Sequence, residues 1–359
     1  MTSTRTRRHR HRTVAKLLLA FTAALGLAAS VATPGIAAPV GVAISDGGTV
    51  HAWGYDAASG RTEIPQTLAD RTVTAIATGS RHSMALTDDG VVHVWPTDNP
   101  VLASSSPPGE LDGKRVIAIA TGNVAGDYFL ALTDEGVIHA WGANGSGETD
   151  IPEELTGKRV TAITAYGMRW AALTEDGAIH LWHPYSYMRS TPSELQGKTV
   201  TAIAANTREW VALTSDGSVI SWTGSGESPS NPQALDGKTV TAIDAADRYG
   251  MALTDDGAVH AWGLNNFGQT DVPQELTGKK VVSIAAGAEH AMALTDDGVI
   301  HAWGSNGNGQ VDVPQALTGK TVTAIAAGWR YSMAIEKDSS PDPCGSGSSG
   351  GSIGSLFGS

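Results

Sequence analysis

The chain has 359 residues and carries 36 acidic against 24 basic side chains, a formal net charge of −12. This acidic balance disfavours general binding to nucleic-acid phosphates. Cys344 is the only cysteine, which excludes a disulfide within the chain, so a folded domain must be stabilised by its core.

The N-terminal segment has the three parts of a secretory signal peptide. Basic side chains are followed by a mostly apolar run at 17–32 and by small residues that include Ala37 and Ala38. We therefore predict a signal peptide at residues 1–37 and a secreted, extracellular or cell-wall-associated protein of net charge −18. The alternative is an uncleaved membrane anchor, although the run is short for a span, and no other stretch approaches that length.

Seven tryptophans recur along the chain at intervals of 40–46 residues. They are Trp53, Trp95, Trp141, Trp182, Trp222, Trp262 and Trp303. A period of about 40 residues with several short strands per unit is typical of a β-propeller blade. We predict an all-β fold, a seven-bladed β-propeller over residues 38–337, with these tryptophans in its core.

One repeat, residues 239–276, illustrates the strands expected in each blade. Strands are predicted at 240–243, 251–254, 258–262 and, as a fourth, 270–272. The Asp256-Gly257 pair between the second and third strands is typical of a hairpin turn.

The two ends of the predicted propeller repeat the same strand. Residues 42–45 and residues 333–336 both match the strand at 251–254. We predict a blade closed by strands from both chain ends, which leaves no exposed sheet edge. One copy of the strand is surplus, and the sequence does not say which.

Residues 338–359 are dominated by Ser, Gly, Pro and Asp. Such a segment cannot bury enough apolar surface to pack, which predicts a disordered tail.

Two other repeated features suggest chemistry but favour structural roles. The first is a histidine two residues before most of the periodic tryptophans: His51, His93, His139, His180, His260 and His301. Side chains on separate sheets lie too far apart to share a metal ion, so we predict packed, hydrogen-bonded histidines and no metal; a pH-sensitive ring is the alternative. The second is a repeated Gly-Lys-Thr turn, which lacks the upstream glycine of a phosphate-binding loop, so no nucleotide or other cofactor is expected.

Strand direction places the loops after strands one and three on one face and the repeated Asp-Gly and Gly-Lys turns on the other. The second face is nearly identical in every repeat, whereas the first varies and carries the three non-periodic tryptophans. Trp, Tyr and Arg are enriched at protein-binding hot spots, so we predict a partner-binding site on the varied face. Its residues are Arg81, His82, Tyr128, Arg169, Trp170, Tyr185, Tyr187, Arg208, Trp210, Arg248, Tyr249, His290, Trp329, Arg330 and Tyr331. The alternative is that these residues only pack on one another around the central channel.

No Ser-His-Asp, paired-carboxylate or Cys/His pattern stands apart from the repeats, so we predict no catalytic residue and no enzyme. The hypothesis is a non-enzymatic protein-binding propeller. A lectin-like binder of cell-wall polymer is the rival, and a hydrolase is a distant third.

The repeats resemble those of the regulator of chromosome condensation family, most clearly at residues 283–310, SIAAGAEHAMALTDDGVIHAWGSNGNGQ. The resemblance recurs seven times across residues 40–337 and implies a seven-bladed propeller. The nuclear founder of that family is a guanine-nucleotide exchange factor on chromatin, a role not expected of an exported acidic chain.

The chain is also similar in style to secreted bacterial propellers that inhibit β-lactamases, through segments such as Gly268-Gln269-Thr270-Asp271-Val272-Pro273. Those inhibitors use aromatic-rich loops on one face of the ring. The resemblance implies inhibition of a secreted or cell-wall enzyme such as a β-lactamase, although this chain has arginines where those loops are mainly aromatic and acidic.

Overall fold

The computed structural model describes residues 42–55, 60–96, 105–122, 127–224 and 233–338. The predicted signal peptide, Cys344 and all of the predicted tail except Asp338 lie outside these residues.

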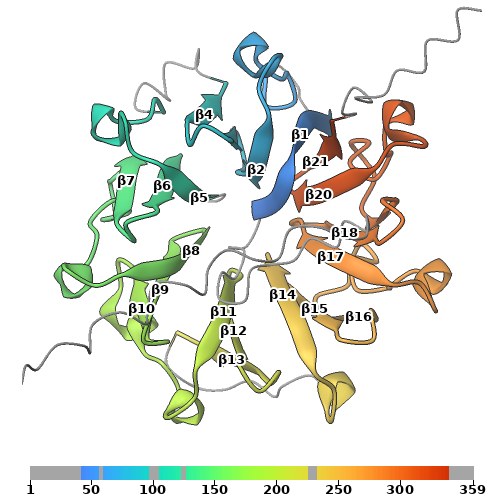
Figure 1. The fold of residues 1–359 in the computed structure, drawn as a ribbon. Coiled ribbons are helices and arrows are strands. Elements are labelled where there is room, and N and C mark those ends of the chain that lie inside the picture. Colours follow the sequence, from blue (N-terminus) through green and yellow to red (C-terminus); the bar gives the residue numbers. More distant parts are fainter. Residues whose placement is uncertain (1–41, 56–59, 97–104, 123–126, 225–232, 339–359) are drawn as a thin grey trace, which may run out of the picture.

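Twenty-one strands form six antiparallel sheets in the described part of the chain. Five of the sheets have three strands each and follow one another along the chain. They comprise β5 (Val116–Thr121), β6 (Tyr128–Thr133) and β7 (Ile138–Gly142); β8 (Val160–Tyr166), β9 (Arg169–Thr174) and β10 (Ile179–Trp182); β11 (Val200–Ala205), β12 (Glu209–Thr214) and β13 (Val219–Thr223); β14 (Val240–Ala246), β15 (Tyr249–Thr254) and β16 (Val259–Gly263); and β17 (Val281–Ala286), β18 (His290–Thr295) and β19 (Ile300–Gly304). Figure 1 shows the sheets arranged radially around a common centre, as in a β-propeller.

The sixth sheet joins the two ends of the described chain. Its six strands lie in the order β20-β21-β1-β2-β3-β4. Their bounds are β20 (Val322–Ala327), β21 (Tyr331–Lys337), β1 (Val42–Gly54), β2 (Val73–Thr78), β3 (Ser83–Thr87) and β4 (Val92–Trp95). Figure 1 shows the blue β1 beside the red β21, so the first and last strands are neighbours.

Strand β1 is long enough to pair with two partners in turn. Its first part pairs with β2, from Val42 opposite Ala77 to Gly48 opposite Val73. Its second part pairs with β21, from Gly48 opposite Lys337 to Gly54 opposite Tyr331. The C-terminal copy of the duplicated strand therefore takes the middle position beside β20, and the N-terminal copy lies against β2 instead.

The fourth strand predicted at residues 270–272 is wrong. This segment forms a turn in which the Asn265 side chain donates to Asp271 (2.7 Å) and accepts from the Thr270 N–H (3.0 Å). Pro273 then leads into a short 3-10 helix. The corresponding helices are η1 (Gln66–Leu68), η3 (Gly109–Leu111), η4 (Glu153–Leu155), η6 (Ser193–Leu195), η7 (Gln233–Leu235), η8 (Gln274–Leu276) and η9 (Gln315–Leu317).

The periodic tryptophans lie between the sheets, as predicted. Six of the seven are at most 8% exposed, and Trp262 is half-buried. Several indole N–H groups donate to a backbone carbonyl of the preceding repeat, as Trp303 does to Gln269 (3.0 Å) and Trp53 to Gln310 (3.1 Å). Each such ring therefore fills the space between two sheets and also holds them in register.

The repeated turns of the second face have a structural explanation. In the β15–β16 turn the Thr254 hydroxyl donates to Asp256 (2.6 Å), which also accepts the Ala258 N–H (3.1 Å). Gly257 follows with φ +80°, a conformation that favours glycine. The hydroxyl bond holds the pKa of the Asp256 carboxyl below its usual range. The same Thr–Asp contact recurs in the other turns at Asp89, Asp176, Asp216 and Asp297.

Candidate partner-binding face

The loop after strand one and the loop after strand three lie on the same face, because they are hydrogen-bonded to each other. The Leu264 N–H after β16 donates to the Arg248 carbonyl before β15 (3.0 Å). The Tyr55 N–H after β1 donates to the Arg330 carbonyl before β21 (2.9 Å) in the same way. This face, which we call the loop face, is the one on which the partner-binding residues were predicted.

In the repeat at 239–276, strand two begins two residues earlier than predicted, and strand two of most other repeats begins at the same position, which changes the surroundings of several of those residues. Strand β15 begins at Tyr249 rather than Met251. Tyr249 lies five residues before Thr254, the residue that ends this strand. The residues at this position are His82, Tyr128, Arg169, Glu209, Tyr249, His290 and Tyr331.

Most side chains at this position reach a neighbouring sheet. The Tyr249 hydroxyl donates to the His290 carbonyl (2.6 Å), and His290 Nε2 contacts the Ser332 hydroxyl (2.9 Å). The Tyr331 hydroxyl donates to the His82 carbonyl (2.7 Å), which links the last repeat to the first. Burial raises the pKa of the Tyr249 hydroxyl and lowers that of His290 to about 4, so both side chains are neutral. These side chains hold sheets together.

The next position along strand two faces the periodic tryptophan of the same sheet. Trp170 lies opposite Trp182 and Trp210 opposite Trp222, and in each pair the rings stack with centroids 6.4 Å apart. Gly250 takes this position opposite Trp262. Two of the three non-periodic tryptophans are therefore core residues.

The structure thus divides the fifteen predicted site residues. Eight are buried: His82, Tyr128, Arg169, Trp170, Trp210, Tyr249, His290 and Tyr331. Five are exposed on the loop face, namely Arg81, Tyr185, Arg208, Arg248 and Trp329, and Arg330 is partly exposed. The side chain of Tyr187 lies outside the described residues. Because the buried side chains cannot be reached by a partner, only the exposed group remains for the predicted site.

The exposed aromatic side chains of the described residues gather on the loop face. They are Tyr185 (55% exposed), Phe267 (48%) and Trp329 (41%), and Arg330 lies 4.4 Å over the Trp329 ring. Phe267, which lies in the loop after β16, was not predicted from the sequence. The sequence did carry a signal for this residue: Phe267 is an aromatic side chain within the W-G-x-N-x-x-G-Q segment, at the position where the next repeat has Asn308.

Tyr185 is positioned by the irregular loop after β10, which contains the short helix η5 (Ser186–Arg189). The buried His183 ring lies between Trp170 and Tyr185, and its Nδ1 accepts the Tyr185 N–H (3.0 Å). Burial and the charge of Arg169 lower the pKa of His183 to about 4, so the ring is neutral. Arg189 donates to the His183 carbonyl through Nε (2.8 Å), which fixes the start of the loop.

One buried cluster resembles a catalytic relay in composition. His82 Nδ1 contacts the Asp127 carboxylate (2.7 Å), and His82 Nε2 contacts the Thr121 hydroxyl. The Thr121 hydroxyl, however, donates its proton to the Tyr128 carbonyl (2.9 Å) and is buried. A nucleophile needs a free, accessible hydroxyl, so this cluster joins two sheets and is not a catalytic site.

Four of the recurrent histidines, His51, His139, His180 and His301, are hydrogen-bonded to charged side chains, as predicted, whereas Nε2 of His93 and of His260 is buried without a hydrogen-bond partner among the residues that the structure describes. His301 Nδ1 contacts Glu275 (2.9 Å) and its Nε2 contacts Lys279 (3.1 Å). This geometry fits a neutral ring that donates to the carboxylate and accepts from the ammonium group. His180 has the same two partners, Glu154 and Lys158. In His260, burial lowers the pKa of the ring.

A buried carboxyl lies between two sheets. Asp244 of β14 is 5% exposed and accepts the backbone N–H of Ala245 (2.8 Å) and of Ala286 in β17 (2.7 Å). Burial raises the pKa of Asp244 to about 7, an effect that the two hydrogen bonds only partly offset. The corresponding positions of the other inner strands hold Ala77, Ala120, Thr164, Ala204, Ala285 and Ala326.

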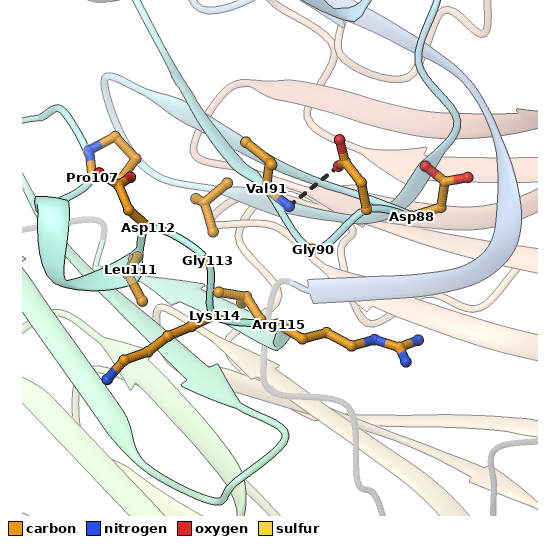
Figure 2. Close-up of a pocket in the computed structure, with 12 residues that line it drawn as sticks. Asp88, Gly90, Val91, Pro107, Leu111, Asp112, Gly113, Lys114 and Arg115 are labelled. Carbon is orange, nitrogen blue, oxygen red and sulfur yellow. Dashed lines mark hydrogen bonds between the residues drawn. The ribbon is translucent and has the colours of Figure 1, made fainter.

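A cavity of about 530 Å³ lies on the opposite face, between the Asp88–Val92 turn and the segment 107–116. Figure 2 shows the Lys114 and Arg115 side chains extending to opposite sides. The Val91 N–H is bonded to Asp89 (3.3 Å). The lining therefore consists of the repeated turns themselves, with acidic and basic groups mixed.

Within the described ranges, no three His, Cys, Asp or Glu side chains are placed to share a metal ion. The same part of the chain contains no helix with the length and hydrophobicity required to cross a membrane.

Solved structures with a similar fold come from several organisms. Prp20p from Saccharomyces cerevisiae is 16% identical with a TM-score of 0.66, over 83% of this chain and 93% of that one. Human WBSCR16 is 14% identical with a TM-score of 0.59, over 80% and 98%. The ectodomain of the Arabidopsis thaliana receptor kinase ACR4 is 16% identical with a TM-score of 0.53, over 75% and 88%. At these identities the likeness concerns the fold alone.

A search of curated proteins finds no significant match. The model of the regulator of chromosome condensation (RCC1) repeat matches residues 73–95, 240–269 and 281–310. These segments cover strands of three sheets and, in two cases, the loop after the tryptophan strand. Three segments of this chain therefore match the repeat of the regulator of chromosome condensation family, and the fold is similar to that of Prp20p, a yeast RCC1.

Proposed function

We propose that the chain is a secreted, non-enzymatic propeller of seven blades that binds a protein partner through its loop face. The partner is an extracellular or cell-wall enzyme, such as a β-lactamase, which the propeller inhibits. Proteins of this fold bind other proteins: the yeast relative has been studied for binding to Gsp1p and histones and in complex with Kap60.

Dividing the six-stranded sheet at β1 supports the proposed count of seven blades. Strands β2, β3 and β4 make one three-stranded unit, and β20, β21 and the second part of β1 make another. Five further sheets of three strands bring the proposed count to seven. The Tyr331–His82 hydrogen bond between these two units supports closure at this point.

One observation carries the binding proposal: the described exposed aromatics Tyr185, Phe267 and Trp329 all lie on the loop face. The large apolar residues exposed on the other face are the smaller Val91, Val137 and Val299, each directly after a repeated turn glycine. Exposed aromatic side chains next to arginines are typical of binding hot spots, whereas a repeated turn is explained by its own hydrogen bonds.

The test is inhibition of purified secreted β-lactamases, measured by hydrolysis of a chromogenic substrate at increasing propeller concentration. We expect saturable, stoichiometric inhibition by the chain without residues 1–37. Trp329→Ala combined with Arg330→Ala should weaken it at least about tenfold, because hot-spot truncations cost about 2 kcal/mol or more.

The matched control changes the opposite face. Asp255→Ala combined with Asp256→Ala should leave the inhibition constant nearly unchanged, with circular dichroism confirming that both double variants are folded. Loss of inhibition in this control and not in the Trp329 variant would contradict the assignment of the face. Absence of inhibition together with retention on purified cell-wall polymer would favour the lectin-like alternative.

A further inference from the structure

The loop face carries a regular set of arginines. Four arginines occupy the same position in the loop before strand two, six residues before the Thr (Glu336 in the last repeat) near the end of that strand: Arg81, Arg208, Arg248 and Arg330. The other three loops have Asp127, Met168 and Glu289 there. Between residues 38 and 337 the sequence has ten arginines, so four of them share one structural position in an acidic protein.

The backbone that presents these arginines is fixed. The carbonyls of Arg248 and Arg330 accept N–H groups from the adjoining loops at 3.0 and 2.9 Å. The Arg208 N–H donates to the Asn206 side chain (2.8 Å). Arg81 precedes His82, whose carbonyl accepts the Gly79 N–H (2.9 Å). The side chains therefore extend from loops that are already ordered, which lowers the entropic cost of binding.

These arginines are available for a partner. Arg81, Arg208 and Arg248 are exposed and Arg330 is partly exposed. Among the described residues, no carboxylate lies within 4.0 Å of their guanidinium groups. Arg169, by contrast, is buried and donates to the Asn206 carbonyl (2.9 Å).

The four arginines form two pairs. Arg330 and Arg81 belong to the loops that follow β20 and β2, and Arg208 and Arg248 to the loops that follow β11 and β14. Figure 1 shows β20 and β2 on either side of β1, and β11 beside β14 across the centre. Positive charge therefore faces a partner from two opposite sides of the loop face.

Among the described residues, no acidic group on the same loops forms an ion pair with these arginines, although Asp247 directly precedes Arg248 and is partly exposed. Glu289 belongs to a different loop, after β17, and Glu209 is half-buried. Burial raises the pKa of the Glu209 carboxyl. Asp127 is occupied by His82 (2.7 Å).

We infer that the partner of the loop face is a protein whose contact surface is acidic, with carboxylates that bind the two arginine pairs. The inference rests on the proposed binding role of this face and adds the charge of the partner. Charge complementarity supports this inference. The rest of this acidic chain repels an acidic partner, so the loops that carry the arginines are the favoured place of contact.

The test uses a fluorescein-labelled peptide of ten glutamates as the probe and fluorescence anisotropy as the measurement, at low ionic strength. The chain without residues 1–37 should bind the peptide, and affinity should fall as salt is added. The variant Arg81→Ala, Arg208→Ala, Arg248→Ala, Arg330→Ala should lose affinity about tenfold or more, since four charged contacts are removed.

A control variant loses the same number of positive charges from the Gly-Lys turns of the opposite face: Lys198→Ala, Lys238→Ala, Lys280→Ala, Lys320→Ala. Its affinity for the peptide should stay within about twofold of the wild type, because only general repulsion increases. Equal losses in both variants, or no binding by the wild type, would overturn the inference.

A labelled polyphosphate of similar length separates the two sources of negative charge. Binding of polyphosphate without binding of the glutamate peptide would overturn the assignment to a protein partner. The test is independent of β-lactamase inhibition: peptide binding through the arginines, in a protein that inhibits no β-lactamase, would refute the proposed target and leave this inference in place.

Discussion

Asp244 makes the stability of the fold depend on pH, and the variant Asp244→Asn tests this. Its carboxyl lies between β14 and β17, and burial raises its pKa to about 7. In the unfolded chain an aspartate has a pKa of about 3.9. The neutral carboxyl is thus favoured in the folded protein, so its contribution to stability is complete below about pH 4 and is lost as pH rises through 7.

The size of the effect follows from the difference between the two pKa values. About three pKa units at 1.36 kcal/mol each give a total of about 4 kcal/mol, of which about 2.5 kcal/mol falls between pH 5 and pH 8. An asparagine does not titrate. Its amide group must face one of the two backbone N–H donors that Asp244 now accepts, so the variant should be about 1–3 kcal/mol less stable than the wild type at pH 5.

The assay is urea unfolding followed by tryptophan fluorescence at several pH values from 5 to 8. The difference in free energy of unfolding between wild type and Asp244→Asn removes the contribution of all other titrating groups. We expect the difference to shrink or reverse sign by pH 8. Parallel curves for the two proteins would refute the reasoning, because they would mean that Asp244 is ionised in the fold at an ordinary pKa.

Three further predictions concern packing between sheets. A Cβ at Gly328 would lie 2.4 Å from the Tyr331 ring, so Gly328→Ala should lower the free energy of unfolding by about 1–3 kcal/mol in urea unfolding. The control is Gly307→Ala, whose Cβ would meet no atom within 4 Å and which should be nearly neutral. Trp170→Ala removes a fully buried ring and should cost about 3–5 kcal/mol in the same measurement; a folded variant of unchanged stability would show that the ring is not core. Tyr331→Phe removes the hydroxyl donor of the buried His82 carbonyl, which keeps the Gly79 N–H as its other donor, and should cost about 0.5–1.5 kcal/mol, detectable as a lower urea midpoint at unchanged slope.

The sequence was sufficient to predict the all-β propeller architecture, because the cause of the fold is itself periodic. A tryptophan every 40–46 residues marks the strand that packs between neighbouring sheets, and its burial confirms the prediction. The Asp-Gly turns were equally predictable, since their Thr–Asp bonds connect residues two positions apart.

The inward or outward direction of side chains near the loops was not predictable from the repeats. Trp170 and Trp329 both lie near the start of strand two, yet Trp170 is the second residue of β9 and lies opposite Trp182, whereas Trp329 lies two residues before β21 and is 41% exposed. The difference depends on a strand boundary two residues away. Asp244 was missed as well, although a carboxyl at a position otherwise held by Ala or Thr was a usable signal.

The pairing of β1 with β21 has a consequence for the order in which the protein assembles. The His51–Glu336 contact in this pair joins residues 285 positions apart. Bringing together two ends of so long a segment costs roughly 5 kcal/mol of chain entropy if nothing between them is folded. This entropic cost falls as the intervening sheets form. The pairing between β1 and β21 should therefore form last. If the protein is exported from its N-terminus, as proposed, the second part of β1 would stay unpaired until Tyr331–Lys337 has crossed the membrane.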